Sequence, residues 1–298
     1  MEGVIRIEDK EYPKLLKEIG KDAPKKLYYK GNWSDIFSAK GETSPLRGGN
    51  NCLAVVGSRH LTGYGRRITE QFVSEIARAG MTIVSGFMYG GDEAAHSATV
   101  RAGGRTIAVM PCGIDLIHPE YQEKLYNEIL ENNGLIISEF EGKFPPAIWT
   151  YLRRNRIVAG LSKAVLIVEA GLNSGTLVTA KDAKKYGRKI FAVPGPITSE
   201  VSKGTIKLIK EGAGVATEAG DILKYYNIFS RSYLEKSSLS PDTGKEEQEI
   251  INQLKREPME ADALARMLGM PISKIGTTLS LMQLKGFINQ ESGKYYVD

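Results

Sequence analysis

The chain has 298 residues, of which 42% are hydrophobic and 25% charged, and its formal net charge is +5. This composition is ordinary for a globular protein long enough for two domains, and it excludes disordered and fibrous classes. The two cysteines, Cys52 and Cys112, have neither a paired motif nor metal-ligand spacing, so disulfide and zinc frameworks are not expected. The N-terminal residues lack the apolar core of a signal peptide, and no apolar run reaches the length of a membrane span. We therefore expect a cytoplasmic protein with no membrane role.

Residues 1–50 are interpreted as a lead-in segment with a structural role. Within it, the run YPKLLKEI has a helical pattern and KLYYKGN an extended one. A loop rich in Gly, Ser and Pro follows at residues 38–50.

Short β-branched runs recur between Cys52 and Ala192, and helical patterns separate them. Each run is too uniformly apolar for a strand with one face in water, so both faces of the sheet should be covered. Strand alternating with helix predicts a parallel α/β sheet with helices on both faces, which we place at residues 51–223. The runs are CLAVVG, MTIVSG, RTIAVM, GLIISE, AVLIVEA and KIFAVPG, and the helices are predicted at residues 66–79, 91–102, 119–132 and 176–186.

A second small domain is predicted at residues 245–298, after a Ser-, Lys- and Pro-rich linker at 224–244. Three helical patterns and a hairpin give it a winged-helix pattern, in which the third helix would read a DNA groove. That helix offers only Lys274 and Lys285, and the domain has seven Lys and Arg against eight Asp and Glu. A role in protein contact or packing therefore stays open beside DNA reading.

Ligands of open parallel sheets sit at the carboxyl ends of the strands, so the loops that follow the predicted strands are the place to look. Three of these loops carry glycines and hydroxyls that suit a phosphate. In the first, Arg59 adds a bidentate donor, although a tight turn without ligand also explains the glycines. The candidate residues are Gly57, Ser58 and Arg59 in the first loop, Ser85 and Gly86 in the second, and Ser174, Gly175 and Thr176 in the third.

The helix after the second strand carries Asp92 and His96 four residues apart, on one face. A metal site would need a third ligand, and neither His60 nor His118 has a carboxylate or cysteine at a metal-ligand spacing. We expect an Asp92–His96 hydrogen bond that fixes the loop, and no metal, no cofactor and no catalytic residues.

An arginine-rich run precedes the fifth strand, with aromatic residues just upstream. Cations interleaved with aromatics suit a single-stranded nucleic-acid groove, where charge meets the backbone and π-faces meet the bases. On a helix some of these arginines would point outward and others toward the sheet edge. The candidate residues here are Tyr151, Arg153, Arg154, Asn155 and Arg156.

The ordered set GSR, T-x-Y-G, IVSG, AAH, RNRIVAGLS, VEA, SGTLVTA and AVPGPI, closing on S-x-G and LIKEGA, resembles the DprA/Smf family, DNA-processing protein A. The resemblance covers residues 12–223, and the tail is similar to that family's winged helix. It implies an extended Rossmann-like fold that binds single-stranded DNA without sequence preference. It also implies a homodimer that loads the RecA recombinase in natural transformation and homologous recombination.

Carried over residue by residue, the resemblance implies phosphate contacts in the three candidate loops and the arginine block. Tyr151 stands where relatives usually carry phenylalanine, which makes it the candidate base-stacking residue. The family's G-I-D before A-A-H is here Gly91-Asp92, which puts details of the pocket in doubt.

An alternative from another class is a nucleotide-hydrolysing enzyme of the LOG type, which has a similar Rossmann-like fold. Thr179 stands where the catalytic glutamate of those enzymes should be, and a threonine cannot supply a carboxylate. A transcription-factor role through the tail is disfavoured by the tail's net charge.

Overall fold

The computed structural model describes residues 2–37, 51–228, 244–291 and 293–297. It divides into two compact units, Met1–Phe229 and Ser230–Asp298, and each is described by itself. The loop predicted at 38–50 and most of the predicted linker lie outside the described residues.

In the described part of the first unit, nine strands form one sheet in the order β1-β2-β6-β5-β4-β3-β7-β8-β9. From β6 to β9 all neighbours pair in parallel, which confirms the predicted parallel α/β sheet. The strands are β1 (Glu2–Arg6), β2 (Lys26–Gly31), β3 (Cys52–Val56), β4 (Thr82–Ser85), β5 (Thr106–Gly113), β6 (Leu135–Phe140), β7 (Ala164–Ile167), β8 (Lys189–Ala192) and β9 (Gly214–Val215).

The N-terminal segment belongs to the same sheet. β1 pairs antiparallel with β2, and β2 pairs antiparallel with β6 through Tyr28 to Ser138 and Gly31 to Leu135. The extended pattern predicted for KLYYKGN is therefore confirmed, and its hydrogen-bonding partner is a strand more than a hundred residues away. The short β1 was not predicted.

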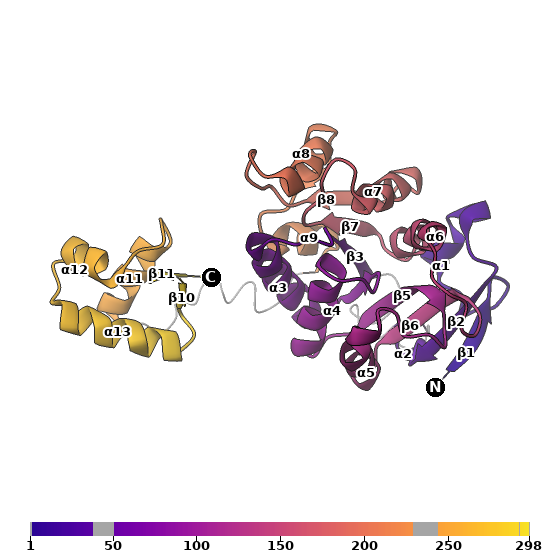
Figure 1. The fold of residues 1–298 in the computed structure, drawn as a ribbon, viewed down its shortest axis with the longest axis horizontal. Helices are drawn as coiled ribbons and strands as arrows, with labels where there is room; N and C mark the ends of the chain where they lie inside the picture. The colour runs from indigo at the N-terminus through magenta and orange to yellow at the C-terminus, as the bar shows by residue number, and fades with distance from the viewer. Residues whose placement is uncertain (1, 38–50, 229–243, 292, 298) are drawn as a thin grey trace. The chain divides into compact units, whose positions relative to one another are not determined.

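Helices cover both faces of the sheet, as predicted (Figure 1). Alternate residues of β3 pack against the helical layers on the two faces. Cys52, Ala54 and Val56 face one layer, and Leu53 and Val55 face the other. One layer contains α1 (Lys14–Lys17), α2 (Trp33–Phe37), α6 (Ile148–Gly160), α7 (Gly175–Lys185) and α8 (Lys203–Lys210); the other contains α3 (Gly63–Arg78), α4 (Gly91–Arg101), α5 (Glu123–Glu131) and α9 (Ala219–Tyr225). Short 3-10 turns occur at Gly20–Asp22, Glu120–Gln122 and Glu200–Ser202.

The chain reverses its direction across the sheet at β3. After β3 it moves outward through β4, β5 and β6, and it then returns to add β7 on the opposite side of β3. The loops after β3 and β7 consequently leave in opposite directions, which opens a crevice at the carboxyl ends of these two strands.

The end of the first unit is anchored by Tyr226. Its hydroxyl donates to the Cys52 carbonyl (2.6 Å) and accepts from the Ala164 amide (3.0 Å), so it ties the starts of β3 and β7 together. Ile228 is also buried. The domain end expected at Leu223 falls inside α9.

The second unit contains α11 (Lys245–Leu254), α12 (Ala261–Leu268) and α13 (Ile272–Leu284), followed by the hairpin strands β10 (Asn289–Glu291) and β11 (Lys294–Tyr296). This order confirms the predicted winged-helix pattern. Lys274 in α13 and Lys285, which caps its end, are ion-paired to α11, Lys274 with Glu246 and Lys285 with Glu247.

Candidate functional site

A cavity of about 570 Å³ lies at the crevice where the chain reverses. Its wall combines the loops after β3, β4 and β7 with one side of α6 and the start of α7. The structure thus brings together most of the residues that the sequence singled out. Those in the wall are Gly57, Ser58, Arg59, Gly86, Tyr151, Arg154, Asn155, Ser174, Gly175 and Thr176.

Two glycines let the loops after β3 and β4 touch. A Cβ on Gly91 would lie only 2.6 Å from the Gly57 Cα, which is closer than side-chain atoms approach. The Gly91 amide donates to the Ser58 carbonyl (3.0 Å), and the Ser58 hydroxyl accepts from the His60 amide (3.0 Å). Glycine is therefore needed at this contact by geometry, and Gly57-Ser58 forms a rigid floor for the cavity.

Arg59 is an exposed residue of the cavity wall, and its guanidinium lies close to two aromatic rings. Its guanidinium carbon is 5.3 Å from the ring centroid of Tyr151 and 5.7 Å from that of Tyr89. The Tyr151 hydroxyl is 2.7 Å from His118 Nε2, which fixes the ring. Arg59 is exposed, so its planar donors face solvent while the rings hold its orientation.

A smaller cavity of about 370 Å³ adjoins the first one at Arg59, Tyr89 and Tyr151. Its further lining includes His118, Tyr121 and Ile148. Tyr121 is 66% exposed, so an aromatic surface continues outward from the site.

Arg154 is buried, unlike Arg59, and belongs to the wall of the cavity. Its Nη1 donates to the Val109 carbonyl (2.6 Å), and its Nη2 is 4.0 Å from Asp92 Oδ2. Burial lowers the pKa of Arg154 and raises that of Asp92, and in each case the charge of the other group opposes the shift. A Cβ on Gly86 would overlap both groups, so the glycine gives this pair its space.

Ser85 does not line the cavity, although it supports the wall. Its buried hydroxyl is within hydrogen-bonding distance of the Val55 carbonyl (2.7 Å) and of Asp92 Oδ1 (3.0 Å). The expected Asp92–His96 hydrogen bond is wrong, because Asp92 points to Ser85 and Arg154. The His96 Nδ1 is instead 2.7 Å from Thr106 Oγ1, and burial lowers the pKa of His96 to about 4.

The start of α7 closes the cavity on the β7 side. Ser174 is its N-cap and accepts from the Thr176 amide (3.2 Å), while the Thr176 hydroxyl donates to the Gly57 carbonyl (3.0 Å). Asn155 Nδ2 reaches the Gly175 carbonyl (3.4 Å) from α6. The positive end of the α7 dipole thus faces the same space as Arg59 and Arg154.

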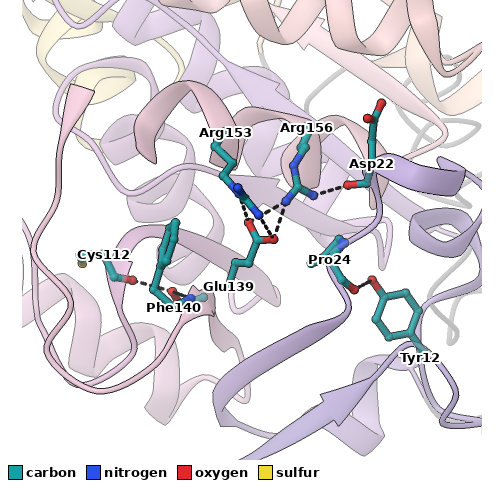
Figure 2. Close-up of polar contacts among 9 residues, drawn as sticks. Tyr12, Asp22, Pro24, Cys112, Glu139, Phe140, Arg153 and Arg156 are labelled. Atoms are coloured by element: carbon teal, nitrogen blue, oxygen red, sulfur yellow. Dashed lines mark hydrogen bonds and ion pairs between the residues drawn. The ribbon is translucent and has the colours of Figure 1, made fainter. Parts of the chain in front are cut away.

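Arg153 and Arg156 do not line this cavity. Helical spacing places them together on another side of α6, where both bind the Glu139 carboxylate, as Figure 2 shows. Arg156 also donates to the Asp22 carbonyl. The arginine run thus splits between two surfaces, with Arg154 in the cavity and its two neighbours outside it.

The sequence did not mark Tyr89, Asp92, His118 or Leu152 as site residues, yet they line the two adjoining cavities. Tyr89 and Asp92 could have been found, since they closely follow the second predicted strand and the candidate residues Ser85 and Gly86. His118 offered no such signal, because only the fold brings it to Tyr151.

The geometry of the cavity wall, with its cationic, hydroxyl and aromatic side chains, suits an anion that carries flat ring systems. Within the described residues, no three His, Cys, Asp or Glu side chains gather as a metal site. None of the described helices is long and apolar enough to cross a bilayer.

The family profile of DNA recombination-mediator protein A matches residues 3–227, and that of the DprA winged helix domain matches residues 235–294. The chain belongs to the DprA/Smf family. This confirms the resemblance seen in its motifs, and residues of GSR, IVSG, RNRIVAGLS and SGTLVTA line the cavity.

Known DprA/Smf proteins match this chain over most of its length. Protein Smf of Escherichia coli is 40% identical over 250 residues, covering 82% of this chain and 67% of the relative. DNA processing protein DprA of Bacillus subtilis is 36% identical over 222 residues, which cover 74% of this chain and 70% of the relative.

Two solved DprA structures share the fold. DprA of Streptococcus pneumoniae has a TM-score of 0.67 at 36% identity, covering 74% of this chain and 73% of the other. DNA processing protein A of Helicobacter pylori has a TM-score of 0.62 at 32% identity, covering 79% and 97%, and that protein is described as binding single-stranded DNA in a unique mode.

Proposed function

We propose that this protein binds single-stranded DNA, without sequence preference, in the cavity at the carboxyl ends of β3 and β7. The observation that carries the proposal is the position of Arg59 in the cavity wall, where its guanidinium lies within cation–π distance of both Tyr89 and Tyr151. One side chain there offers a phosphate donor, and its neighbours offer two rings.

The backbone of the strand would be held by fixed positive charge. Arg59 reaches solvent with a planar guanidinium, Arg154 adds a buried charge in the wall, and the α7 N-terminus adds a helix dipole. These groups recognise phosphate rather than base identity, so the affinity should fall steeply with salt.

The bases would be recognised by stacking. Tyr151 and Tyr89 present their rings beside Arg59, and Tyr121 continues the aromatic surface into the adjoining cavity. Every base has a π-face, so stacking does not select a sequence. Bases paired inside a duplex do not offer their faces, and the site should therefore favour the single strand.

The proposed role includes a second step, in which a recombinase is loaded onto the bound strand. The protein would act as a homodimer that loads the RecA recombinase onto the bound strand in recombination and natural transformation. Support for this step comes from the family, whose description is a DNA recombination mediator. A RecA filament-assembly assay on a strand coated with single-stranded-DNA-binding protein tests it, and unchanged assembly on addition of this protein would contradict it.

The alternative, a nucleotide hydrolase, finds no support in the cavity. Thr179 lines the wall at the position where that enzyme class needs a glutamate. The Asp92 carboxylate in the wall is engaged by Ser85 and Arg154. We therefore propose a binding protein without catalytic activity.

The test of strand binding is fluorescence anisotropy of a labelled oligo-dT strand, titrated with the protein at several salt concentrations. A duplex of equal length serves as competitor. We expect tight, salt-sensitive binding that the duplex displaces poorly. Preference for the duplex would overturn the proposal.

A further inference from the structure

A second basic surface lies on another side of α6. It is a depression of about 550 Å³ between the N-terminal segment, the end of β6 and α6. We propose that this depression and the aromatic cluster beside it form a second contact for the same single strand. This inference rests on the proposed function, because it concerns the path of the strand beyond the first cavity.

The lining of the depression is strongly basic. The carboxylates are Asp22 and Glu139, and the five basic side chains are Lys21, Lys25, Lys26, Arg153 and Arg156. The three lysines are exposed, so their ammonium groups can reach a backbone passing over the depression. The excess of positive charge suits a chain of phosphates.

Glu139 holds the two arginines in place rather than neutralising the whole surface. Arg153 Nε and Nη2 contact its two oxygens at 2.8 and 2.9 Å, and Arg156 Nη2 contacts both at 2.6 Å (Figure 2). Burial alone would raise the pKa of Glu139, but the hydrogen bonds from Arg153 and the nearby arginine charges hold it below the usual range. The Arg153 side chain is still 51% exposed, so it can contact a ligand from a fixed position.

An exposed aromatic cluster adjoins the depression. Phe140, which lines the depression, stacks on Phe144 with ring centroids 4.7 Å apart and planes 12° apart. Trp149 meets both rings edge-on, at 5.7 and 6.1 Å. Trp149 is 50% exposed and Phe144 is 38% exposed, so the cluster presents faces for bases beside cations for the backbone.

Helix α6 joins the depression to the first cavity. Tyr151, Arg154 and Asn155 of this helix line the cavity, while Arg153 and Arg156 line the depression. Leu152, which lines the cavity, is 46% exposed next to them. A helix with its side chains is only about 10–12 Å across, so a strand leaving the cavity can cross α6 and reach the depression.

The experiment compares oligo-dT strands of two lengths, one of about 6 and one of about 20 nucleotides. The short strand should fill the first cavity alone, and the long strand should also reach the depression. The test variant is Lys25→Ala/Arg153→Ala, which leaves Glu139 paired with Arg156. The matched control is Lys207→Ala/Lys210→Ala on α8. Like the test variant it removes two exposed positive charges, but far from the depression in the sequence.

We expect the test variant to bind the long strand roughly tenfold more weakly at low salt and to bind the short strand as the unsubstituted protein does. Its salt slope for the long strand should fall by about 1.4, the value for two phosphate contacts on a single strand. The control variant should change neither the affinity for the long strand nor its salt slope. Equal affinity of variant and unsubstituted protein for the long strand overturns the inference, as does equal weakening by the control.

Tryptophan fluorescence gives an independent readout, because the chain has two tryptophans and Trp33 is buried. The long strand should quench the emission of Trp149, the short strand should not, and Trp149→Phe should abolish the difference. Quenching that is the same for both lengths, or absent for both, contradicts the second contact. If the unsubstituted protein binds neither length, the proposed function itself fails, and that result is distinct from loss of the length dependence alone.

Discussion

The Arg59 guanidinium lies 5.3 Å from the ring centroid of Tyr151, and the two residues come from elements almost a hundred positions apart in the chain. Arg59 follows β3, and Tyr151 is in the first turns of α6. Their contact exists because the strand order reverses at β3, and it places charge and a stacking surface at one point.

Arg59→Ala should weaken oligo-dT binding by roughly ten- to a hundredfold, because a hydrogen bond to a charged group contributes about 1.5–3 kcal/mol. The salt slope should fall by about 0.7 for one lost phosphate contact. Anisotropy at several salt concentrations measures both quantities. Arg101→Ala, which removes an exposed arginine paired with Glu70, is the control. An Arg59 variant with unchanged affinity would remove Arg59 from the binding site.

Tyr151→Ala should cost about 1–3 kcal/mol of strand affinity, the value of one base stacked on an aromatic ring. Tyr151→Phe keeps the ring and loses only the hydrogen bond to His118, so it should retain most of the affinity. Equal losses in the two variants would mean that the hydroxyl, and not the ring, binds the strand.

Arg154→Ala should destabilise the fold by about 3–5 kcal/mol, because it leaves the buried Asp92 carboxylate without its compensating charge. Urea unfolding measures this loss. The double variant Arg154→Ala/Asp92→Ala should lose less than the sum of the two single variants. Additive losses would show that the two groups do not interact. For the same reason Arg154 variants cannot test strand binding in isolation, and Arg59 is the better choice.

Stability should fall as the pH is lowered from about 6.5, through His96. The unfolded chain takes up a proton near the ordinary histidine pKa of about 6.5, while burial keeps His96 neutral until about pH 4. Protonation thus favours the unfolded chain in this window, and the free energy of unfolding should decrease by about 3 kcal/mol across it. Urea unfolding between pH 6.5 and 5 gives the slope before carboxylates titrate. His96→Asn should reduce that slope and leave a smaller part from His118, whose pKa burial also lowers, and an unchanged slope would exclude His96 as a source.

Truncation after Phe229 should leave strand affinity and stability nearly intact, because Lys274 and Lys285 are already paired to α11. Truncation after Leu223 should destabilise the first unit, since it removes Tyr226 and Ile228 from the core. Thermal unfolding and anisotropy of both shortened proteins separate these outcomes. A large loss of strand affinity in the protein truncated after Phe229 would make the winged helix the main DNA contact.

The central sheet could be predicted because its strands are continuous apolar runs with helical patterns between them. The loop residues Gly57 and Ser174 could be placed at one edge because the carboxyl ends of parallel strands share it. β1 was missed because its five residues, EGVIR, carry a charge at each end and form no long apolar run. Its only pairing is with β2, at the edge of the sheet. Helical spacing predicted that the arginine run divides between two faces, but which arginine enters the cavity was not predictable, because that depends on where Glu139 and Asp92 lie in space.

The measurement that tests the central claim most directly is photocrosslinking of an oligo-dT strand carrying iododeoxyuridine, with the attached residues identified by mass spectrometry. Our account predicts attachment at Tyr151 or Tyr89, and its loss when Arg59 is replaced by alanine. Attachment confined to the winged-helix unit would contradict it.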